Sequence, residues 1–249
     1  MVAPVGHLQE LFVSFQGEGS TVGTKTLFVR MAGCSLRCRF CDTPKALVRT
    51  EWAEFQGLLA ADGSPRRQKN PLTVDDVVAA VDELDPSRRC WISFTGGEPL
   101  EQVEFLVALA PRLAPRPRHL ETAGVHAAAM ERLRPHLEWV AFDLKLDSVA
   151  HEGDRTEEHR AFLCASRGVG RCAKAIIGPT TDVAELGRLA ALVAEEDRTI
   201  PFILQPETPR HGGAPELPFA LLNACHDAVA SHLADVRVIP QTHKFLRLP

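Results

Sequence analysis

Short apolar runs alternate with amphipathic stretches along most of this 249-residue chain. The apolar runs predict strands near residues 26–32, 90–95, 118–122, 138–143, 173–177, 200–205 and 235–239. The stretches between them predict helices, among them 73–84 and 182–195, which both open with a capping pattern. Helices that separate consecutive strands are typical of parallel sheets. We therefore expect one α/β domain over residues 1–249, an incomplete (β/α) barrel of mostly parallel strands.

One segment does not follow this alternation. Residues 49–70 are polar, contain Gly63 and Pro65, and carry several charges. Glycine, proline and clustered polar residues are typical of loops. We expect an irregular insertion near 49–70.

Three cysteines lie together directly after the predicted strand 26–32, namely Cys34, Cys38 and Cys41. Thiolates are soft ligands that suit iron–sulfur clusters, zinc or copper(I). A cubane cluster normally takes four cysteines, so three would leave one iron open for a small molecule. Zinc ligands usually come as two pairs, and the second pair is missing from this loop. The spacing favours a 4Fe–4S cluster, with a zinc site completed by a distant ligand, or three free thiols, as the alternatives.

A second motif, Gly96-Gly97-Glu98-Pro99, follows Thr95 at the end of another predicted strand. Glycine has no Cβ atom, so the backbone can approach a ligand closely there. Active groups of (β/α) barrels collect at the carboxyl ends of the strands. Both motifs are therefore expected on one face of the barrel, which gives them more weight together than either has alone.

Composition restricts the classes of function. The formal net charge is −4, and no large basic cluster suggests nucleic-acid binding. The sequence has no run of about 18 apolar residues, and residues 1–7 do not resemble a signal peptide. An odd cysteine count favours the reducing cytoplasm over a disulfide scaffold. The remaining cysteines are expected to be buried small hydrophobes: Cys90, Cys164, Cys172 and Cys225.

The cysteine loop and the Gly-Gly-Glu-Pro motif resemble the signature of the radical S-adenosylmethionine superfamily. Further segments resemble, in the same order, the 7-carboxy-7-deazaguanine synthases, radical enzymes of queuosine precursor synthesis. These segments are FQGEG at 15–19, LFVRMAGCSLRCRFCDT at 27–43, TGGEP at 95–99, QP at 205–206 and QTHKFLRLP at 241–249. The resemblance spans nearly the whole chain and is strongest at its two ends.

This resemblance implies the barrel type of the radical S-adenosylmethionine enzymes and a definite reaction. A lyase of this family converts 6-carboxy-5,6,7,8-tetrahydropterin to 7-carboxy-7-deazaguanine and releases ammonia, through a ring contraction. A 5′-deoxyadenosyl radical derived from S-adenosylmethionine takes hydrogen from C6 of the pterin and is then recycled. The resemblance also implies a 4Fe–4S cluster, Mg²⁺, a reducing partner such as flavodoxin or ferredoxin, and a homodimer. It implies neither nucleic acid nor a membrane as a partner.

Roles for individual residues follow from the same resemblance. The cluster would be held by Cys34, Cys38 and Cys41, and magnesium by the hydroxyl of Thr43. Contacts with S-adenosylmethionine would come from Phe40, Gly96, Gly97, Glu98, Asp143, Leu144, Lys145, Gln205, Pro206, Glu207 and Thr208. Contacts with the pterin would come from Phe15, Gln16, Gly17, Glu18, Arg30, Thr95, His243 and the terminal carboxylate of Pro249. The guanidinium of Arg30 suits a substrate carboxylate because it can make two parallel charge-assisted hydrogen bonds.

Two segments depart from the family pattern. Asp143-Leu144-Lys145 replaces Ser-Pro-Lys, and Glu121-Thr122-Ala123-Gly124 replaces Glu-Thr-Asn-Gly. The first resembles the Asp-x-Lys of glycyl-radical enzyme activases, which act on a partner protein, so an activase is the alternative function. An activase does not explain FQGEG, Arg30 or the QTHK segment. A non-catalytic iron–sulfur or zinc scaffold would explain the cysteines but not residues 95–99.

Overall fold

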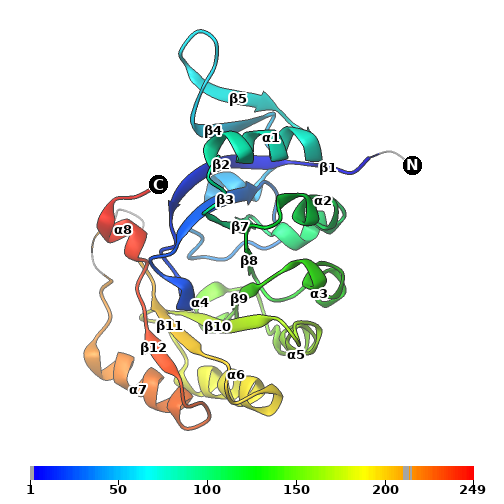
Figure 1. Ribbon diagram of the computed structural model, residues 1–249. Helices are drawn as coiled ribbons and strands as arrows, with labels where there is room; N and C mark the ends of the chain where they lie inside the picture. The colour runs from blue at the N-terminus through cyan, green and yellow to red at the C-terminus, as the bar shows by residue number, and fades with distance from the viewer. Residues whose placement is uncertain (1–2, 210–212, 214) are drawn as a thin grey trace.

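The fold is built around one ten-stranded sheet in the order β12-β11-β10-β9-β8-β7-β3-β2-β4-β5 (Figure 1). The structure, a computed structural model, describes residues 3–209, 213 and 215–249. Neighbouring strands are parallel from β3 through β12: β3 (Lys25–Met31), β7 (Trp91–Gly96), β8 (Arg118–Thr122), β9 (Trp139–Asp143), β10 (Gly170–Ile177), β11 (Phe202–Pro206) and β12 (Val236–Val238). The two ends of this order do not pair within the described residues, which confirms the incomplete barrel.

The longer helices follow the strands and lie along the outer side of the curved sheet in Figure 1. They are α1 (Val74–Leu84), α2 (Val103–Leu109), α3 (Ala127–Leu133), α5 (Thr156–Ala165), α6 (Val183–Glu196) and α7 (Phe219–Ala230). Two short helices, α4 (Asp147–Ala150) and α8 (Thr242–Leu246), follow β9 and β12. The predicted capping box begins α1: Asp76 N–H donates to the Thr73 hydroxyl at 3.2 Å, and Thr73 N–H donates to the Asp76 carboxylate at 2.9 Å. Among the described residues, no helix combines the length and apolar character needed to cross a membrane.

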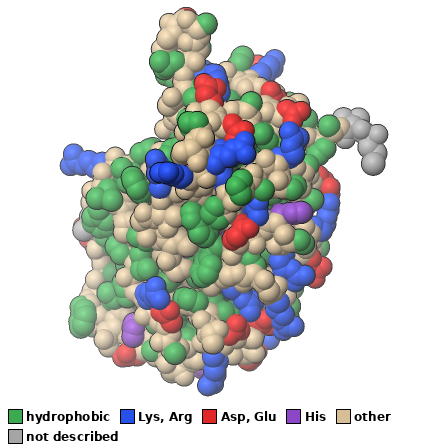
Figure 2. All heavy atoms as spheres, viewed as in Figure 1, with side chains coloured by type: hydrophobic (Ala, Val, Ile, Leu, Met, Phe, Trp, Pro, Cys, Tyr) green, Lys and Arg blue, Asp and Glu red, His purple; other side chains and the backbone are tan. Residues whose placement is uncertain are grey.

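Residues 49–70 are not irregular, so that expectation was wrong. They contain β4 (Trp52–Leu59) and β5 (Pro65–Lys69), which form an antiparallel hairpin that projects from the molecule in Figure 2. Strand β4 pairs with β2 (Leu8–Phe15), which is itself antiparallel to β3, and the hairpin thereby extends the sheet. Short strands β1 (Val5–Gly6) and β6 (Leu72–Thr73) pair separately. Side chains along β4 alternate between exposed and buried, and Ala53 and Phe55 are buried in the core. This burial holds β4 against the rest of the sheet.

One smaller expectation, the burial of all four cysteines outside the loop, also needs correction. Cys164 is exposed on α5, with its Sγ 3.8 Å from a Glu196 carboxylate oxygen, whereas Cys90, Cys172 and Cys225 are buried as expected.

Side chains along the parallel strands alternate between the core and a cavity. Leu120 of β8 is buried in the core, while His119 and Glu121 on either side of it line a cavity inside the barrel. Lys174 of β10 lines the same cavity, and Ala173 and Ala175 belong to the core. Successive side chains of a strand point to opposite faces, so each strand supplies both core and site.

Candidate active site

A cavity of about 390 Å³ opens at the carboxyl ends of the parallel strands. Most of the residues predicted for the site line it, although they come from both ends and the middle of the sequence. They are Phe15, Gln16, Gly17, Glu18, Arg30, Cys34, Cys38, Phe40, Cys41, Thr43, Thr95, Gly96, Gly97, Asp143, Lys145, Glu207, Thr208, His243 and Pro249.

Four predicted residues do not line the cavity: Glu98, Leu144, Gln205 and Pro206 are all buried beside it. Glu98 makes structural contacts instead. Its carboxylate accepts hydrogen bonds from the Thr122 hydroxyl at 2.7 Å and from Ala123 N–H at 2.8 Å. Burial raises the pKa of Glu98, against the effect of these hydrogen bonds. Its side chain joins the loops after β7 and β8 and does not face the cavity.

The cysteine loop is fastened to its surroundings by backbone hydrogen bonds. Cys34 N–H donates to Leu47 O at 3.3 Å, and Arg39 N–H donates to Ala150 O at 3.0 Å. The three thiols are half-buried and unpaired, and none of the other four cysteines lines the cavity. Burial raises the pKa of Cys34 to about 11 and also raises the pKa of Cys38. Thiolates at these positions therefore require a positively charged group to balance them, which fits a metal cluster with three cysteine ligands.

Gly96 and Gly97 pack against the start of the cysteine loop. Gly97 N–H donates to Met31 O at 3.1 Å. A Cβ atom added to Gly97 would lie 2.1 Å from Gly33 O, and one added to Gly96 would lie 2.3 Å from Met31 O. Gly96 also has a φ of +141°, a region that favours glycine. The two glycines thus allow the loop after β7 to contact the end of β3 directly.

Arg30 is held in place at one side of the cavity. Its Nε donates to Glu10 Oε1 at 2.7 Å, and its guanidinium lies 5.3 Å from the centre of the Phe12 ring. Gln56 of the β4–β5 hairpin donates to the other oxygen of Glu10. The Phe12 ring stacks on Phe28 at 4.9 Å, and both rings line the cavity. This side therefore offers a fixed cation beside an aromatic wall.

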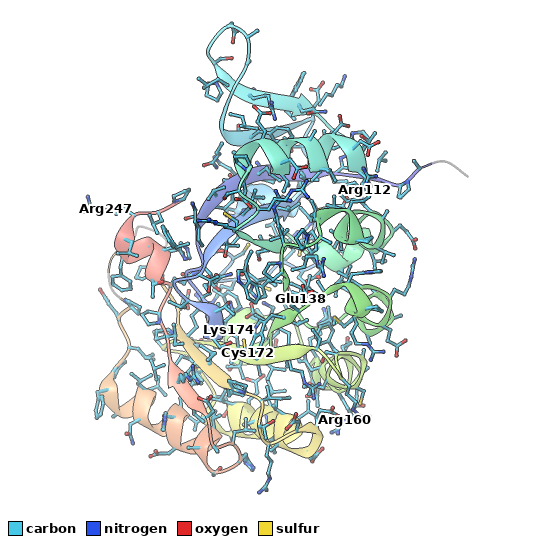
Figure 3. All side chains as sticks on the ribbon, viewed as in Figure 1. Arg112, Glu138, Arg160, Cys172, Lys174 and Arg247 are labelled. Atoms are coloured by element: carbon cyan, nitrogen blue, oxygen red, sulfur yellow. The ribbon has the colours of Figure 1, made fainter. Side chains whose placement is uncertain are left out.

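Buried charges of alternating sign cross the floor of the cavity. Asp143 lies between two lysines, with Lys145 Nζ 3.0 Å and Lys174 Nζ 3.1 Å from its oxygens, and Lys174 also contacts the Glu18 carboxylate. Figure 3 shows Lys174 well inside the outline of the molecule. Burial opposes ionisation of Asp143, but the two lysines lower its pKa. Burial likewise opposes the charge of Lys174, but Asp143 and Glu18 raise its pKa well above the ordinary value.

The C-terminal segment closes one side of the cavity. Thr242 N–H donates to Gly17 O at 2.9 Å, and the Gln241 amide donates to Glu18 at 2.6 Å and to Asp42 at 2.7 Å. The Lys244 ammonium lies 3.2 Å from Asp42. Residues from the two ends of the sequence are therefore in direct contact, as Figure 1 shows for α8 beside β2 and β3.

Comparison with known proteins agrees with this geometry. Residues 28–166 match the Radical SAM superfamily. A 7-carboxy-7-deazaguanine synthase of Geobacter sulfurreducens is 34% identical over 99% of this chain and 99% of its own length. This chain belongs to the 7-carboxy-7-deazaguanine synthase family. A synthase of Methanothermobacter thermautotrophicus is 30% identical over all of both chains. The crystal structure of QueE from Escherichia coli has the same fold, with a TM-score of 0.64 at 21% identity over 95% of this chain and 94% of that one.

Family membership decides between the alternatives drawn from the sequence. The relatives that match over nearly the whole chain are synthases, so the activase reading of Asp143-Leu144-Lys145 is not favoured. A non-catalytic scaffold is also not favoured, because both the superfamily and the relatives are enzymes.

Sequence reasoning missed several residues that line this synthase-family cavity. The most prominent are His119, Glu121, Lys174 and Gln241. Glu121 accepts hydrogen bonds from the Ser93 hydroxyl at 2.6 Å and from the Gln16 amide at 2.9 Å. It therefore orients Gln16, a residue predicted to contact the substrate. Charged residues within predicted buried strands were the available signal, because a buried charge needs a partner or a ligand.

Proposed function

We propose that this chain converts 6-carboxy-5,6,7,8-tetrahydropterin to 7-carboxy-7-deazaguanine with loss of ammonia, by a radical mechanism that uses S-adenosylmethionine. One observation carries the proposal: three cluster-type cysteines, most of the predicted cofactor residues and all of the predicted substrate residues line a single cavity. Radical chemistry needs the reacting atoms close together and protected from competing reactions. A single walled cavity meets both requirements.

The cofactor side of the cavity is the half next to the cysteine loop. Cys34, Cys38 and Cys41 would hold the cluster, and Asp143, Lys145 and Thr208 would contact S-adenosylmethionine. The Thr208 hydroxyl is buried against the cavity and has no hydrogen-bond partner among the described residues, which supports a ligand contact there. When bound, the cluster and S-adenosylmethionine supply the radical that starts the reaction. The protein's own residues orient the substrate toward it and exclude water.

The substrate side would recognise the two ends of a carboxylated pterin. Arg30 would bind the carboxylate in a charge-assisted contact. The hydrogen bond with Glu10 uses only Nε of Arg30, and it fixes the direction of the guanidinium. Gln16 and Glu18 would bind the polar edge of the ring. The stacked pair Phe12 and Phe28 provides an apolar wall for the ring faces.

Magnesium belongs to the same proposal, with the Thr43 hydroxyl as its protein ligand. That hydroxyl lies 3.0 Å from Asp42, beside a group in which Glu18, Asp42 and His243 bring ligand atoms within 4.8 Å of one another. Burial would raise the pKa of Asp42, but Lys244 and the Gln241 amide hold it at about 2. Magnesium prefers oxygen ligands and commonly binds few protein groups together with substrate oxygens, which suits this corner of the cavity.

Partners of the enzyme are also proposed. A reducing protein such as flavodoxin or ferredoxin would reduce the cluster, and the working enzyme would be a homodimer in the cytoplasm. The half-buried thiols support the cellular location, because cluster ligands must remain reduced.

The test is anaerobic reconstitution with iron and sulfide, followed by incubation with a reductant, S-adenosylmethionine, magnesium and the pterin. We expect 7-carboxy-7-deazaguanine by mass spectrometry, and ammonia in equal amount. The Cys34→Ala, Cys38→Ala and Cys41→Ala variants should lose both the cluster and the product, whereas Cys225→Ala should keep both. A wild-type protein that binds zinc through these cysteines and refuses iron would exclude the proposed function.

A further inference from the structure

Lys174 lies between two residues for which different ligands are proposed. Its ammonium is 3.1 Å from Asp143 Oδ1, on the S-adenosylmethionine side, and it also contacts the Glu18 carboxylate, on the substrate side. The side chain belongs to β10 and is almost completely buried. Lys174 is therefore a direct physical link between the two halves of the cavity.

The link continues on both sides to the cysteine loop. Asp143 contacts Lys145, whose ammonium lies 5.2 Å from the centre of the Phe40 ring. Glu18 accepts a hydrogen bond from Gln241, which also donates to Asp42. The contacts thus run around the cavity from Phe40 to Asp42, the two residues on either side of Cys41.

The backbone in the middle of this series is fixed, which leaves its side chains to respond to a ligand. Leu144 N–H donates to Lys174 O at 2.7 Å, so the backbone after Asp143 is fixed to β10. Hydrogen-bonded ion pairs are stronger in a buried site than in water. A ligand that fixes the Asp143 carboxylate therefore also restricts Lys174 and, through it, Glu18.

We propose that Lys174 is a positioning residue that couples the binding of S-adenosylmethionine to the binding of the pterin substrate. The inference rests on the proposed function, because it uses the ligands proposed there for Asp143 and Glu18. The first ligand orders the Asp143–Lys174–Glu18 series, and the second then binds to a site that is already ordered. Coupling of this kind is reciprocal, so each ligand tightens the other by the same factor.

Binding measurements without turnover test this directly. The cluster-loaded protein is kept anaerobic and without reductant, and the dissociation constant of each ligand is measured by calorimetry, with and without a saturating amount of the other. For the wild-type protein we expect both constants to fall by the same factor, about fivefold or more.

Lys174→Met should bring this factor close to one, while each ligand alone binds within a few-fold of its wild-type constant. Lys174→Arg should retain most of the coupling, because a guanidinium can also contact two carboxylates. Lys69→Met, on the exposed strand β5, should behave as the wild type. If Lys174→Met does not load its cluster, Lys174→Gln takes its place, since an amide still fills the site without carrying charge.

The possible failures can be distinguished. A wild-type protein that binds neither ligand overturns the proposed function, and the inference with it. A wild-type protein that binds both ligands independently, or a Lys174→Met protein with the wild-type coupling factor, overturns the inference alone. Loss of coupling in Lys174→Met that Lys174→Arg restores is the expected result.

Discussion

Thr43 is the residue on which the proposed magnesium site depends. Replacing it with alanine removes the hydroxyl proposed to bind magnesium beside Asp42 but leaves the three cysteines unchanged. We expect turnover of Thr43→Ala to fall on the order of tenfold, the size typical of weakened support for a bound metal, and to respond less to magnesium. Iron content should stay at the wild-type level. Thr43→Ser keeps the hydroxyl and should keep most activity, so an equal loss in both variants would contradict the assignment.

His159 gives a prediction about stability and pH. Its ring accepts a hydrogen bond from Lys145 N–H and contacts Gly124 O, both at 2.9 Å, and burial lowers its pKa from 6.5 to about 4. The unfolded chain therefore binds a proton at pH 5 that the folded chain does not. Stability from this group is present above pH 6.5 and is lost as the pH falls toward 4.

Between pH 7 and pH 5 this effect amounts to about 2 kcal/mol of unfolding free energy. Over the same interval, the free energy of unfolding of His159→Gln should fall by about 2 kcal/mol less than that of the wild type. Urea unfolding of preparations with equal iron content measures this difference. His226→Gln, at a side chain 42% exposed, serves as the control and should follow the wild type. Equal slopes for the wild type and His159→Gln would show that the imidazole titrates normally.

At the scale of single residues, the sequence predicted the groups that stand in motifs. The three cysteines, Gly97 and Arg30 line the cavity as expected. Lys174 and Glu121 could not be assigned in the same way, because their importance depends on partners that are distant in sequence. Lys174 contacts Glu18, 156 positions earlier, and Glu121 binds Gln16, 105 positions earlier.

The β4–β5 hairpin is an element whose purpose the sequence did not reveal. It reaches the site through Gln56, which binds Glu10, which in turn binds Arg30. Gln56→Ala should therefore lower kcat/KM for the pterin by about two- to tenfold, the value of one hydrogen bond, with unchanged binding of S-adenosylmethionine. Lys69→Ala, on the same hairpin but away from Glu10, should have no effect. A Gln56→Ala enzyme with normal kinetics would limit the hairpin to a structural role.

The short helix α8 is positioned by the absence of a side chain at Gly17. A Cβ atom there would lie 2.2 Å from His243 Nδ1. Gly17→Ala should push α8 away from the cavity and raise the KM for the pterin by roughly tenfold or more, because small displacements in a site cost large factors. The dissociation constant of S-adenosylmethionine should remain within about twofold of the wild-type value.

Gly187→Ala is the matched control for Gly17→Ala, because the nearest atom to its new Cβ is 4.0 Å away on the neighbouring helix. It should be neutral in both measurements. A Gly17→Ala enzyme with unchanged substrate kinetics would show that α8 does not contact the bound pterin.

At the scale of the whole molecule, the alternation of strands and helices was sufficient to predict the parallel part of the sheet. The strands β3 and β7 through β12 lie where the apolar runs place them. The extension by β4 and β5 was not predicted, because both strands are largely exposed and polar on their outer face. Exposed edge strands give a weaker hydrophobic pattern than buried ones, so the composition of residues 49–70 resembled that of a loop.

The fold brings residues from near both ends of the sequence and from six strands, β2, β3 and β7 through β10, to one cavity. The proposed function depends on the removal of hydrogen from C6 of the pterin in this cavity. The most direct measurement uses substrate deuterated at C6 with the reconstituted enzyme, S-adenosylmethionine and reductant. We expect deuterium in the remaining S-adenosylmethionine together with 7-carboxy-7-deazaguanine, because recycling of the proposed radical transfers deuterium from the substrate into S-adenosylmethionine. Product without deuterium in S-adenosylmethionine, or no product from cluster-loaded enzyme, would contradict it.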